Sequence, residues 1–352
     1  MPTRRVRVGL AGARWVGNQH ATALRAVPGV VLAAIADADE RVRHEAGQTH
    51  SVSRLYADYR DMIAGGGLDA VAIALPTGMH CEACCAALRA GLHVICEKPP
   101  TSSVAEMKRI KRCADDTGLT YMFGRQSRFS PGVLASRRAV AAGRLGRVYH
   151  GEAVWVRSRW AALSQAGWRM DRTRGGGVLL DLGVHAIDEV WFCMGCPRPI
   201  EVSAGLHAGF ARFSAAPKLY TADDCAAGLL RFENGATLSF LAAFALNGLP
   251  QGVKCADGKP CEWGHRAIYG TGAGLLTGSG TLIRGGPGDL VSADLPRTAR
   301  HAPFEGQARE FIRAVRTGST PLNSAEQALM LMRMLEGACR SADLGRAVRI
   351  GA

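Results

Sequence analysis

An acidic and a basic side chain lie four residues apart in the segment GGGVLLDLGVHAID, as Asp181 and His185. On a helix, side chains at this spacing share a face, so both groups can reach the same oxygen atom. An imidazole exchanges protons near neutral pH, and a neighbouring carboxylate can orient the imidazole or a substrate hydroxyl. The pair is therefore suited to moving a proton to or from a hydroxyl group. The alternative is a core histidine that is hydrogen-bonded to the backbone.

Lys98 is a third candidate functional residue. The chain contains only six lysines and uses arginine for nearly every other positive charge. An ammonium group is compact and can approach a substrate oxygen, whereas a guanidinium is bulkier and always charged. A lysine at this position therefore indicates a specific need for an ammonium. The alternative is a surface lysine before the turn at Pro99 and Pro100.

Glycines between an apolar run and a helical run form a candidate dinucleotide site. The segment VGLAGARWVGNQHATAL places Gly12 and Gly17 where backbone N–H groups and a helix dipole meet a pyrophosphate. The middle position of the GxGxxG pattern holds Arg14, so its side chain must turn outward or change the loop. Its guanidinium is a bidentate donor that can instead pair with a phosphate, which is our hypothesis for this residue.

Asp37 ends the second predicted strand, about twenty residues after the glycine turn, where a carboxylate accepts hydrogen bonds from the adenosine ribose. The same carboxylate would repel a 2′-phosphate, and the neighbouring Ala38 brings no positive charge. The sequence therefore favours NAD over NADP as the cofactor. The alternative is a turn residue within IADADE.

The 352 residues favour two domains, and a composition of 47% hydrophobic and 21% charged residues is that of a globular protein. The net charge of +13 is spread along the chain and lies in no recognised nucleic-acid module, so we expect no nucleic-acid partner. No apolar run reaches the length of a membrane span, and the N-terminus has no signal-peptide core. We expect a cytoplasmic protein without a membrane partner.

Eleven cysteines include two CxxC pairs, Cys81 with Cys84 and Cys193 with Cys196. Both pairs lie in apolar, helix-like runs, where cysteine serves as a small buried hydrophobe. An odd count without a secretion signal points to reduced thiols. We therefore predict no metal site.

The first part of the chain alternates short apolar runs with longer helical stretches, which predicts a doubly wound parallel sheet covered by helices on both faces. The predicted strands are Val6 to Leu10, Val30 to Ala36, Ala70 to Ala74 and His93 to Cys96.

After about Phe123 the pattern becomes α+β with a largely antiparallel, open sheet, and a hairpin is predicted at Glu233-Asn234-Gly235. Two amphipathic helices end the chain, and the Gly-rich piece from Gly270 to Gly288 is predicted as a surface loop with a short strand. The predicted strands are Val148 to Val156, Ile200 to Gly205, Ala226 to Phe232, Ala236 to Phe244 and Arg266 to Gly270.

The motifs CEKPP at 96–100 and GGGVLLDLGVHAID, in this order and spacing, resemble the glucose-fructose oxidoreductase and inositol dehydrogenase (Gfo/Idh/MocA) family. The resemblance continues through GRQSRFSP, AIYGTGAG and the C-terminal FIRAVRTGSTPLNSAEQALMLMRMLEGACRSADLGRAV, and covers nearly the whole chain. It implies an NAD-binding Rossmann domain over 1–124 and a substrate-binding and oligomerisation domain over 125–352, with C-terminal helices that can pack back on the first domain.

The resemblance also implies roles for the residues named above. Lys98 would lie between the nicotinamide ribose and the substrate hydroxyl, and would stabilise developing alkoxide charge. Asp181 and His185 would line the opposite wall, with His185 as the general base and Asp181 orienting the hydroxyl or the imidazole. These three are the predicted catalytic residues.

Two further sets of residues complete the predicted site. Those for the cofactor are Gly12, Arg14, Trp15, Val16, Asp37, Pro76, Thr77, His80, Glu97 and Lys98. Those for the substrate are Arg125, Trp168, Arg169, Asp181 and His185.

The function implied by the resemblance is NAD-dependent hydride transfer between nicotinamide and a secondary alcohol or ketone of a sugar, cyclitol or related polyol. Two alternatives remain open. One is an enzyme that retains NAD and uses transient oxidation for elimination or epimerisation, and the other is a catalytically inactive sugar-sensing regulator. We expect a homo-oligomer, either a dimer or a tetramer, because an open-faced sheet readily makes a subunit contact.

Overall fold

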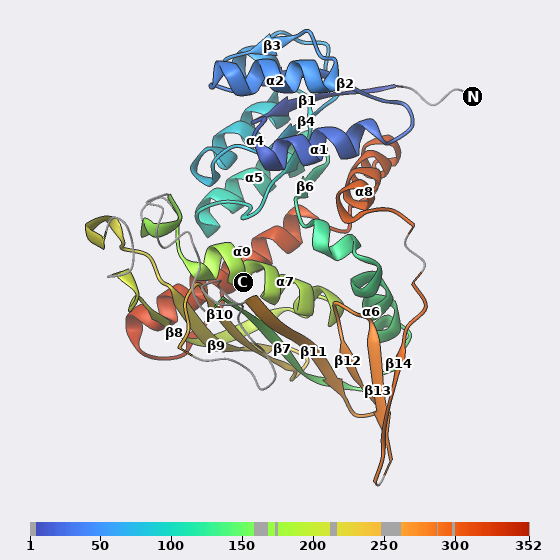
Figure 1. The fold of residues 1–352 in the computed structure, drawn as a ribbon, viewed down its shortest axis with the longest axis vertical. Helices are drawn as coiled ribbons and strands as arrows, with labels where there is room; N and C mark the ends of the chain where they lie inside the picture. Colours follow the sequence, from blue (N-terminus) through green and yellow to red (C-terminus); the bar gives the residue numbers. More distant parts are fainter. Residues whose placement is uncertain are drawn as a thin grey trace, which may run out of the picture. The chain divides into compact units, whose positions relative to one another are not determined.

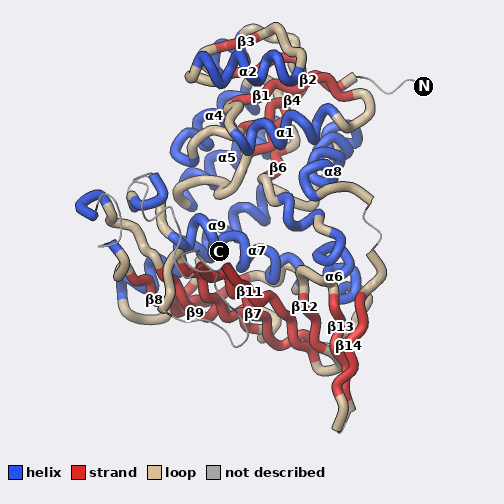
Figure 2. Tube along the Cα trace, viewed as in Figure 1, coloured by secondary structure: helices blue, strands red, loops and turns tan. Residues whose placement is uncertain are grey.

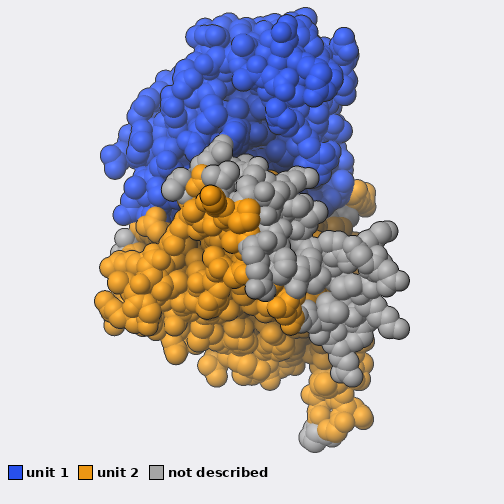
Figure 3. Space-filling model, turned by 60° about the vertical axis from the view of Figure 1, so that its left-hand side comes forward, with its two compact units in different colours: residues 1–129, 301–332 blue, residues 130–300, 333–352 orange. Residues whose placement is uncertain are grey.

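The protein is described by a computed structural model that covers residues 5–157, 168–172, 175–211, 217–247, 262–286, 288–297 and 300–351 (Figure 1). Helices and strands alternate in the first part of the chain, and strands predominate between residues 199 and 294 (Figure 2). The chain forms two compact units (Figure 3). One comprises residues 1–129 and 301–332, and the other comprises residues 130–300 and 333–352.

The first unit contains a six-stranded parallel sheet in the order β3-β2-β1-β4-β5-β6, the strand order of a dinucleotide-binding fold. The predicted doubly wound parallel sheet is therefore confirmed. Its strands are β1 (Val6–Ala11), β2 (Val30–Ala36), β3 (Leu55–Tyr56), β4 (Ala70–Ile73), β5 (His93–Cys96) and β6 (Tyr121–Phe123).

Helices connect these strands, and the core between helices and sheet is made of continuous apolar strand residues such as Val8, Leu10 and Ile35, together with Leu24 of α1 and Phe311 of α8. Strands that are apolar along their whole length need cover on both faces, which is typical of parallel sheets. The helices of this unit are α1 (Trp15–Arg25), α2 (Glu40–His50), α3 (Tyr59–Ala64), α4 (His80–Arg89), α5 (Val104–Thr117) and α8 (Pro303–Thr317).

The second unit contains a nine-stranded sheet in the order β14-β13-β12-β11-β7-β10-β9-β8-β15. Only the β7–β10 pair is parallel, so the expected, largely antiparallel sheet is confirmed. Its strands are β7 (Val148–Arg157), β8 (Pro199–His207), β9 (Cys225–Phe232), β10 (Thr237–Ala243), β11 (Glu262–Gly270), β12 (Gly274–Leu276), β13 (Thr281–Gly285), β14 (Leu290–Asp294) and β15 (Val348–Arg349).

Two local predictions in this unit have different outcomes. The hairpin at Glu233-Asn234-Gly235 is confirmed, since it joins β9 to β10 with Gly235 at a φ of 80°. The prediction of a surface loop with one short strand from Gly270 to Gly288 underestimates the strand content, because this segment contributes two strands, β12 and β13, to the sheet. Pairing with neighbouring strands outweighs the low strand preference of its glycines.

The helices of the second unit lead to the candidate site. They are α6 (Pro131–Ala141) and α7 (Val184–Cys193), and the long helix α9 (Ala325–Leu344) runs from the first unit's residues into those of the second. A π-helical segment, Leu179–Gly183, leads directly into α7. Within the part of the chain that the structure describes, no helix is long and apolar enough to cross a membrane.

Candidate active site

The glycine turn between β1 and α1 has a backbone that other residues would not allow. Gly12 has a φ of 89°, and a Cβ atom there would lie 2.5 Å from the carbonyl oxygen of Ala74. At Gly17 a Cβ atom would lie 2.0 Å from the carbonyl oxygen of Gly12. No described side chain caps the start of α1 at Trp15, so its first N–H groups remain available to an anion. The turn therefore fits a pyrophosphate.

Asp37 holds this turn to the end of β2. Its Oδ2 accepts the N–H of Ala13 at 2.8 Å, and its Oδ1 accepts the N–H of Asp39 at 2.9 Å. The guanidinium of Arg14 turns outward and forms an ion pair with Asp39 at 3.1 Å, with 72% of its side chain exposed. The side chain of Arg14 therefore does not cover the backbone of the glycine turn.

Lys98 is the second residue after β5, and Glu97, which lies between them, is buried in an ion pair. Oε1 of Glu97 lies 2.7 Å from Nε2 of His20 on α1, and Oε2 accepts the N–H of Lys98 at 3.0 Å. Burial alone would raise the pKa of Glu97, but the hydrogen bond and charge of His20, with the N–H and ammonium of Lys98, hold that pKa below its ordinary value. This pair fixes the backbone that carries Lys98.

The segment after β4 also lies at the carboxyl edge of the parallel sheet. Pro76 and the buried Thr77 enter a short 3-10 turn that leads into α4. The ring of His80 is buried and bonds the carbonyl oxygen of Leu75 at 2.8 Å and that of Pro99 at 3.0 Å. His80 therefore ties the end of β4 to the turn after Lys98.

Asp181 and His185 belong to the second unit, and the element that carries them differs from the helix predicted. Asp181 lies in the π-helical segment and is buried, whereas His185 lies in the first turn of α7 and is half-buried. The wider π-helical turn changes the angle between residues four positions apart, and such turns occur frequently at functional sites. Sequence periodicity carries no signal for this turn.

Contacts within the second unit hold both side chains. The Nε of Arg169 lies 3.2 Å from Oδ2 of Asp181. The ring of Trp155 on β7 lies 5.4 Å from that of His185, at an interplanar angle of 56°. Neither Trp155 nor the π-helical turn was identified from the sequence, because a tryptophan in a strand is usually a packing residue.

The remaining predicted residues are placed as follows. Trp15 is the exposed first residue of α1, and Val16 follows it half-buried. The side chain of Arg125 is completely buried in the first unit. Trp168 begins a short 3-10 turn, and its side chain lies outside the described part of the chain.

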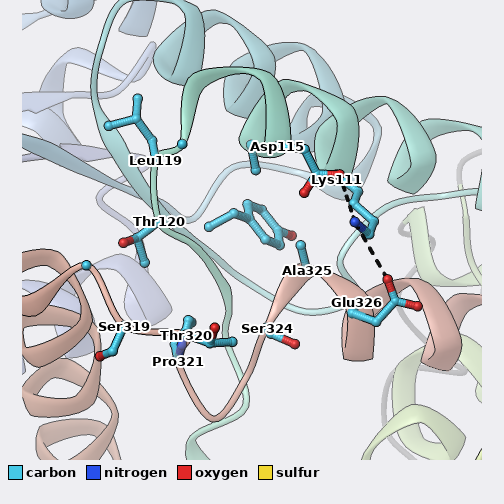
Figure 4. A pocket seen from close by; sticks show the side chains of 14 residues that line it. Lys111, Asp115, Leu119, Thr120, Ser319, Thr320, Pro321, Ser324, Ala325 and Glu326 are labelled. Atoms are coloured by element: carbon cyan, nitrogen blue, oxygen red, sulfur yellow. Dashed lines mark hydrogen bonds and ion pairs between the residues drawn. The ribbon is translucent and has the colours of Figure 1, made fainter.

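A separate polar cavity of about 250 Å³ lies in the first unit between the end of α5, the approach to β6 and the start of α9 (Figure 4). It is bordered by an ion pair in which Nζ of Lys111 lies 3.7 Å from Oε2 of Glu326. None of the predicted cofactor or substrate residues lines it. The cavity is therefore not part of the candidate active site.

Comparison with known proteins assigns the chain to a family. Residues 6–125 match the family described as "Oxidoreductase family, NAD-binding Rossmann fold", and residues 133–254 match the "GFO/IDH/MocA C-terminal domain". The chain belongs to the Gfo/Idh/MocA family. The resemblance expected from its motifs is thereby confirmed.

Two relatives and one solved structure illustrate the range of this family. D-apiose dehydrogenase of Paraburkholderia graminis is 27% identical over 99% of this chain and 90% of its own length. D-xylose 1-dehydrogenase (NADP(+)) 2 of Haloferax volcanii is 28% identical over 90% of this chain and 91% of its own. Levoglucosan dehydrogenase, solved in complex with NADH and levoglucosan, has 22% identity and a TM-score of 0.86 over 99% of this chain and 100% of its own. The last comparison supports the fold.

The buried Glu97 of this Gfo/Idh/MocA protein generates a prediction on stability. Replacing Glu97 with Gln should lower the free energy of unfolding by about 1–3 kcal/mol at neutral pH, because a buried charge-assisted bond is lost. Since the folded-state pKa of Glu97 is lowered, this stabilisation is present above its ordinary pKa of about 4.3 and disappears as the pH falls through the folded value.

Urea unfolding of wild type and Glu97→Gln at a series of pH values checks this. The difference in unfolding free energy should shrink from neutral pH towards about pH 3. Glu82→Gln, which changes a surface carboxylate paired with Arg60, is the control and should have little effect. A difference for Glu97→Gln that stays constant over this range would contradict the prediction.

Proposed function

We propose that this protein transfers a hydride between nicotinamide and a secondary alcohol or ketone of a sugar, cyclitol or related polyol. The observation that carries the proposal is that both domains match one oxidoreductase family while the residues suited to the chemistry are present. Lys98 follows a strand at the carboxyl edge of the nucleotide-binding sheet, the usual place of a ligand in such sheets. Sugars are also the compounds named for D-apiose dehydrogenase and D-xylose dehydrogenase.

The residues of the first unit fit a nicotinamide dinucleotide. The N–H groups at the start of α1 and the close backbone of Gly12 would hold the pyrophosphate, and Asp37 would bind the adenosine ribose. Pro76, Thr77 and Lys98 would border its nicotinamide half. When bound, the cofactor supplies the acceptor or donor of the hydride.

The acid–base chemistry falls to the three predicted catalytic residues. For oxidation, His185 removes the proton of the substrate hydroxyl, and the ammonium of Lys98 stabilises the developing alkoxide. Asp181, held by Arg169, orients the hydroxyl or the imidazole. In the reverse direction His185 returns the proton to the carbonyl oxygen. Because these residues belong to two units, their meeting around one substrate is part of the proposal.

A spectrophotometric screen tests the function and the role of His185. Wild-type protein with NAD should form NADH with at least one member of a panel of pentoses, glycosides, anhydrosugars and inositols. His185→Ala should lower turnover by about two to four orders of magnitude with nearly unchanged NAD affinity, because it removes the general base. His44→Ala, at an exposed histidine of α2, is the matched control.

Two outcomes would contradict this proposal. Activity of His185→Ala near that of wild type would remove His185 from its role. Conversion of a sugar without stoichiometric NADH would favour transient oxidation by a retained cofactor.

We further propose that the enzyme prefers NAD to NADP. The carboxylate of Asp37 follows β2 and is held by two N–H groups, and on this proposal it would face the adenosine ribose, where it would repel a 2′-phosphate. Two cations lie close by: Arg14 is paired with Asp39, and the guanidinium of Arg43 donates to the main-chain carbonyl oxygen of Asp37 at 2.6 Å. A negative charge at this position disfavours NADP.

Variants at Asp37 check this preference. Asp37→Asn keeps an acceptor for the Ala13 N–H and removes the charge, so the affinity for NADP relative to NAD should rise about tenfold, equivalent to about 1.4 kcal/mol. Asp37→Ala should weaken NAD more than NADP. Equal loss of both cofactors in binding titrations would argue against recognition of the ribose.

A homo-oligomer, a dimer or tetramer formed through the nine-stranded sheet, is our proposal for the assembly. One face packs on α7, since a Cβ atom at Gly151 would lie 2.7 Å from Val190. Successive strand residues point to opposite faces, so the other face carries His150, which bonds Thr237, and Glu152. No described helix covers that second face. A broad sheet face of this kind is a common subunit contact.

Light scattering after size exclusion measures the assembly. Wild type should have the mass of a dimer or tetramer. Leu241→Arg, which places a charge on the second face beside Val154, should lower that mass. Leu344→Arg, at an exposed position near the end of α9, is the control. A monomeric wild type would refute the proposal.

The compartment that we propose is the cytoplasm. None of the nine cysteines that the structure describes is in a disulfide. Five of them, Cys81, Cys84, Cys85, Cys96 and Cys113, are buried in the first unit. Buried thiols of this kind are usual in reducing compartments.

A further inference from the structure

The N–H groups at the start of the π-helical segment that carries Asp181 are hydrogen-bonded to a residue from a distant part of the chain, Asp223. This aspartate lies in the connection between β8 and β9. Its main-chain carbonyl accepts the N–H of Val178 at 2.9 Å, and its Oδ2 accepts the N–H of Leu179 at 3.0 Å. N–H groups at the start of a helical segment have no partner within it. Asp223 therefore caps this segment through tertiary contacts.

The carboxylate of Asp223 also lies against the backbone of Gly177. Gly177 has a φ of 118°, and a Cβ atom there would lie 2.2 Å from Oδ1 of Asp223. Only glycine allows both this conformation and this approach. The carbonyl oxygen of Gly177 accepts the N–H of Asp181 at 3.0 Å. Asp223, Gly177 and Asp181 thus form a continuous chain of direct contacts.

The same residues are tied to the segment that holds the side chain of Asp181. The N–H of Gly177 donates to the carbonyl oxygen of Arg169 at 2.9 Å, and Arg169 forms the ion pair with Asp181. The N–H of Thr221, two residues before Asp223, donates to the carbonyl oxygen of Met170 at 2.9 Å. The segments around Arg169 and around Asp223 are therefore hydrogen-bonded to each other, and together they hold both the backbone and the side chain of Asp181.

We propose that Asp223 is a positioning residue for the reaction. Its carboxylate fixes the first turn of the π-helical segment, and thereby the place of Asp181 and of His185 in the turn that follows. The inference rests on the proposed function, since it concerns the residues assigned there to acid–base chemistry. It adds a residue outside the family motif that contains them. A displacement of a catalytic group by about 1 Å is enough to lower turnover about a hundredfold.

Three variants of Asp223 distinguish the effect of its hydrogen bond to the Leu179 N–H from the effect of its negative charge. Asp223→Ala removes the acceptor of the Leu179 N–H, and Asp223→Asn keeps an acceptor at the same place without the charge. Asp223→Glu keeps the charge and displaces the acceptor by one methylene group. The matched control is Asp224→Asn, since this neighbouring buried carboxylate accepts the N–H groups of Gly209 and Phe210 instead.

The first measurement is steady-state kinetics with the substrate found in the screen. Asp223→Ala should lower kcat by about 10- to 100-fold with a KM for NAD close to wild type, because the cofactor residues lie in the other unit. Asp223→Asn should restore kcat to within about fivefold of wild type. Asp224→Asn can lower the melting temperature but should leave kcat unchanged.

The second measurement is hydrogen–deuterium exchange of the full chain, which needs no activity. In Asp223→Ala, peptides that cover residues 178–185 should exchange about tenfold faster or more, while those of β1 and β4 should not change. Where Asp223→Ala does not fold, Asp223→Glu is measured instead and should show the same two effects.

The outcomes separate this inference from the proposed function. A normal kcat in folded Asp223→Ala, or unchanged exchange at residues 178–185, would overturn the positioning role. An Asp223→Asn variant as impaired as Asp223→Ala would also overturn it, since capping does not require the charge. A wild type inactive on every polyol would refute the proposed function, and exchange alone would then decide whether Asp223 fixes the segment.

Discussion

Parallel pairing of the strands in the first unit decides where every predicted cofactor residue lies. Because all six strands run in one direction, their carboxyl ends meet at the same edge of the sheet. Gly12, Asp37, Pro76 and Lys98 follow four different strands and are far apart in the sequence. The sheet gathers them at one edge. The common location of the predicted cofactor residues is therefore a consequence of strand direction.

Two polar contacts, one buried and one half-buried, then couple the elements at that edge. The Glu97–His20 pair joins α1, whose start faces the glycine turn, to the residue before Lys98. Asp37 joins the end of β2 to the same turn through the N–H of Ala13. A buried charge without a partner would be costly, and both carboxylate oxygens of the buried Glu97 have hydrogen-bond partners. The polar groups that hold the glycine turn and the backbone of Lys98 thus also contribute to the folding stability of the unit.

The sequence predicted what depends on local pattern. Apolar strands such as Val30–Ala36, and the carboxylate at the end of this strand, are visible in the residues themselves. The contacts made by Arg14 and Asp223 were not, because both depend on partners brought close by folding. For the segment from Gly270 to Gly288 only one short strand within a loop was predicted, because its two strands gain their stability from pairing with neighbours.

The second unit holds Asp181 on an irregular helical segment and His185 in the first turn of the regular helix that follows it. A π-helical turn is rare and occurs mostly as a single turn next to α-helical residues, frequently at a functional site. Here the fixing contacts come from Asp223 at the start of the segment and from Arg169 beside Asp181. The regular helix α7 then carries His185 against Trp155. Asp181 and His185 are thus carried by two different helical elements, each with its own contacts, rather than by the one continuous helix expected from their spacing.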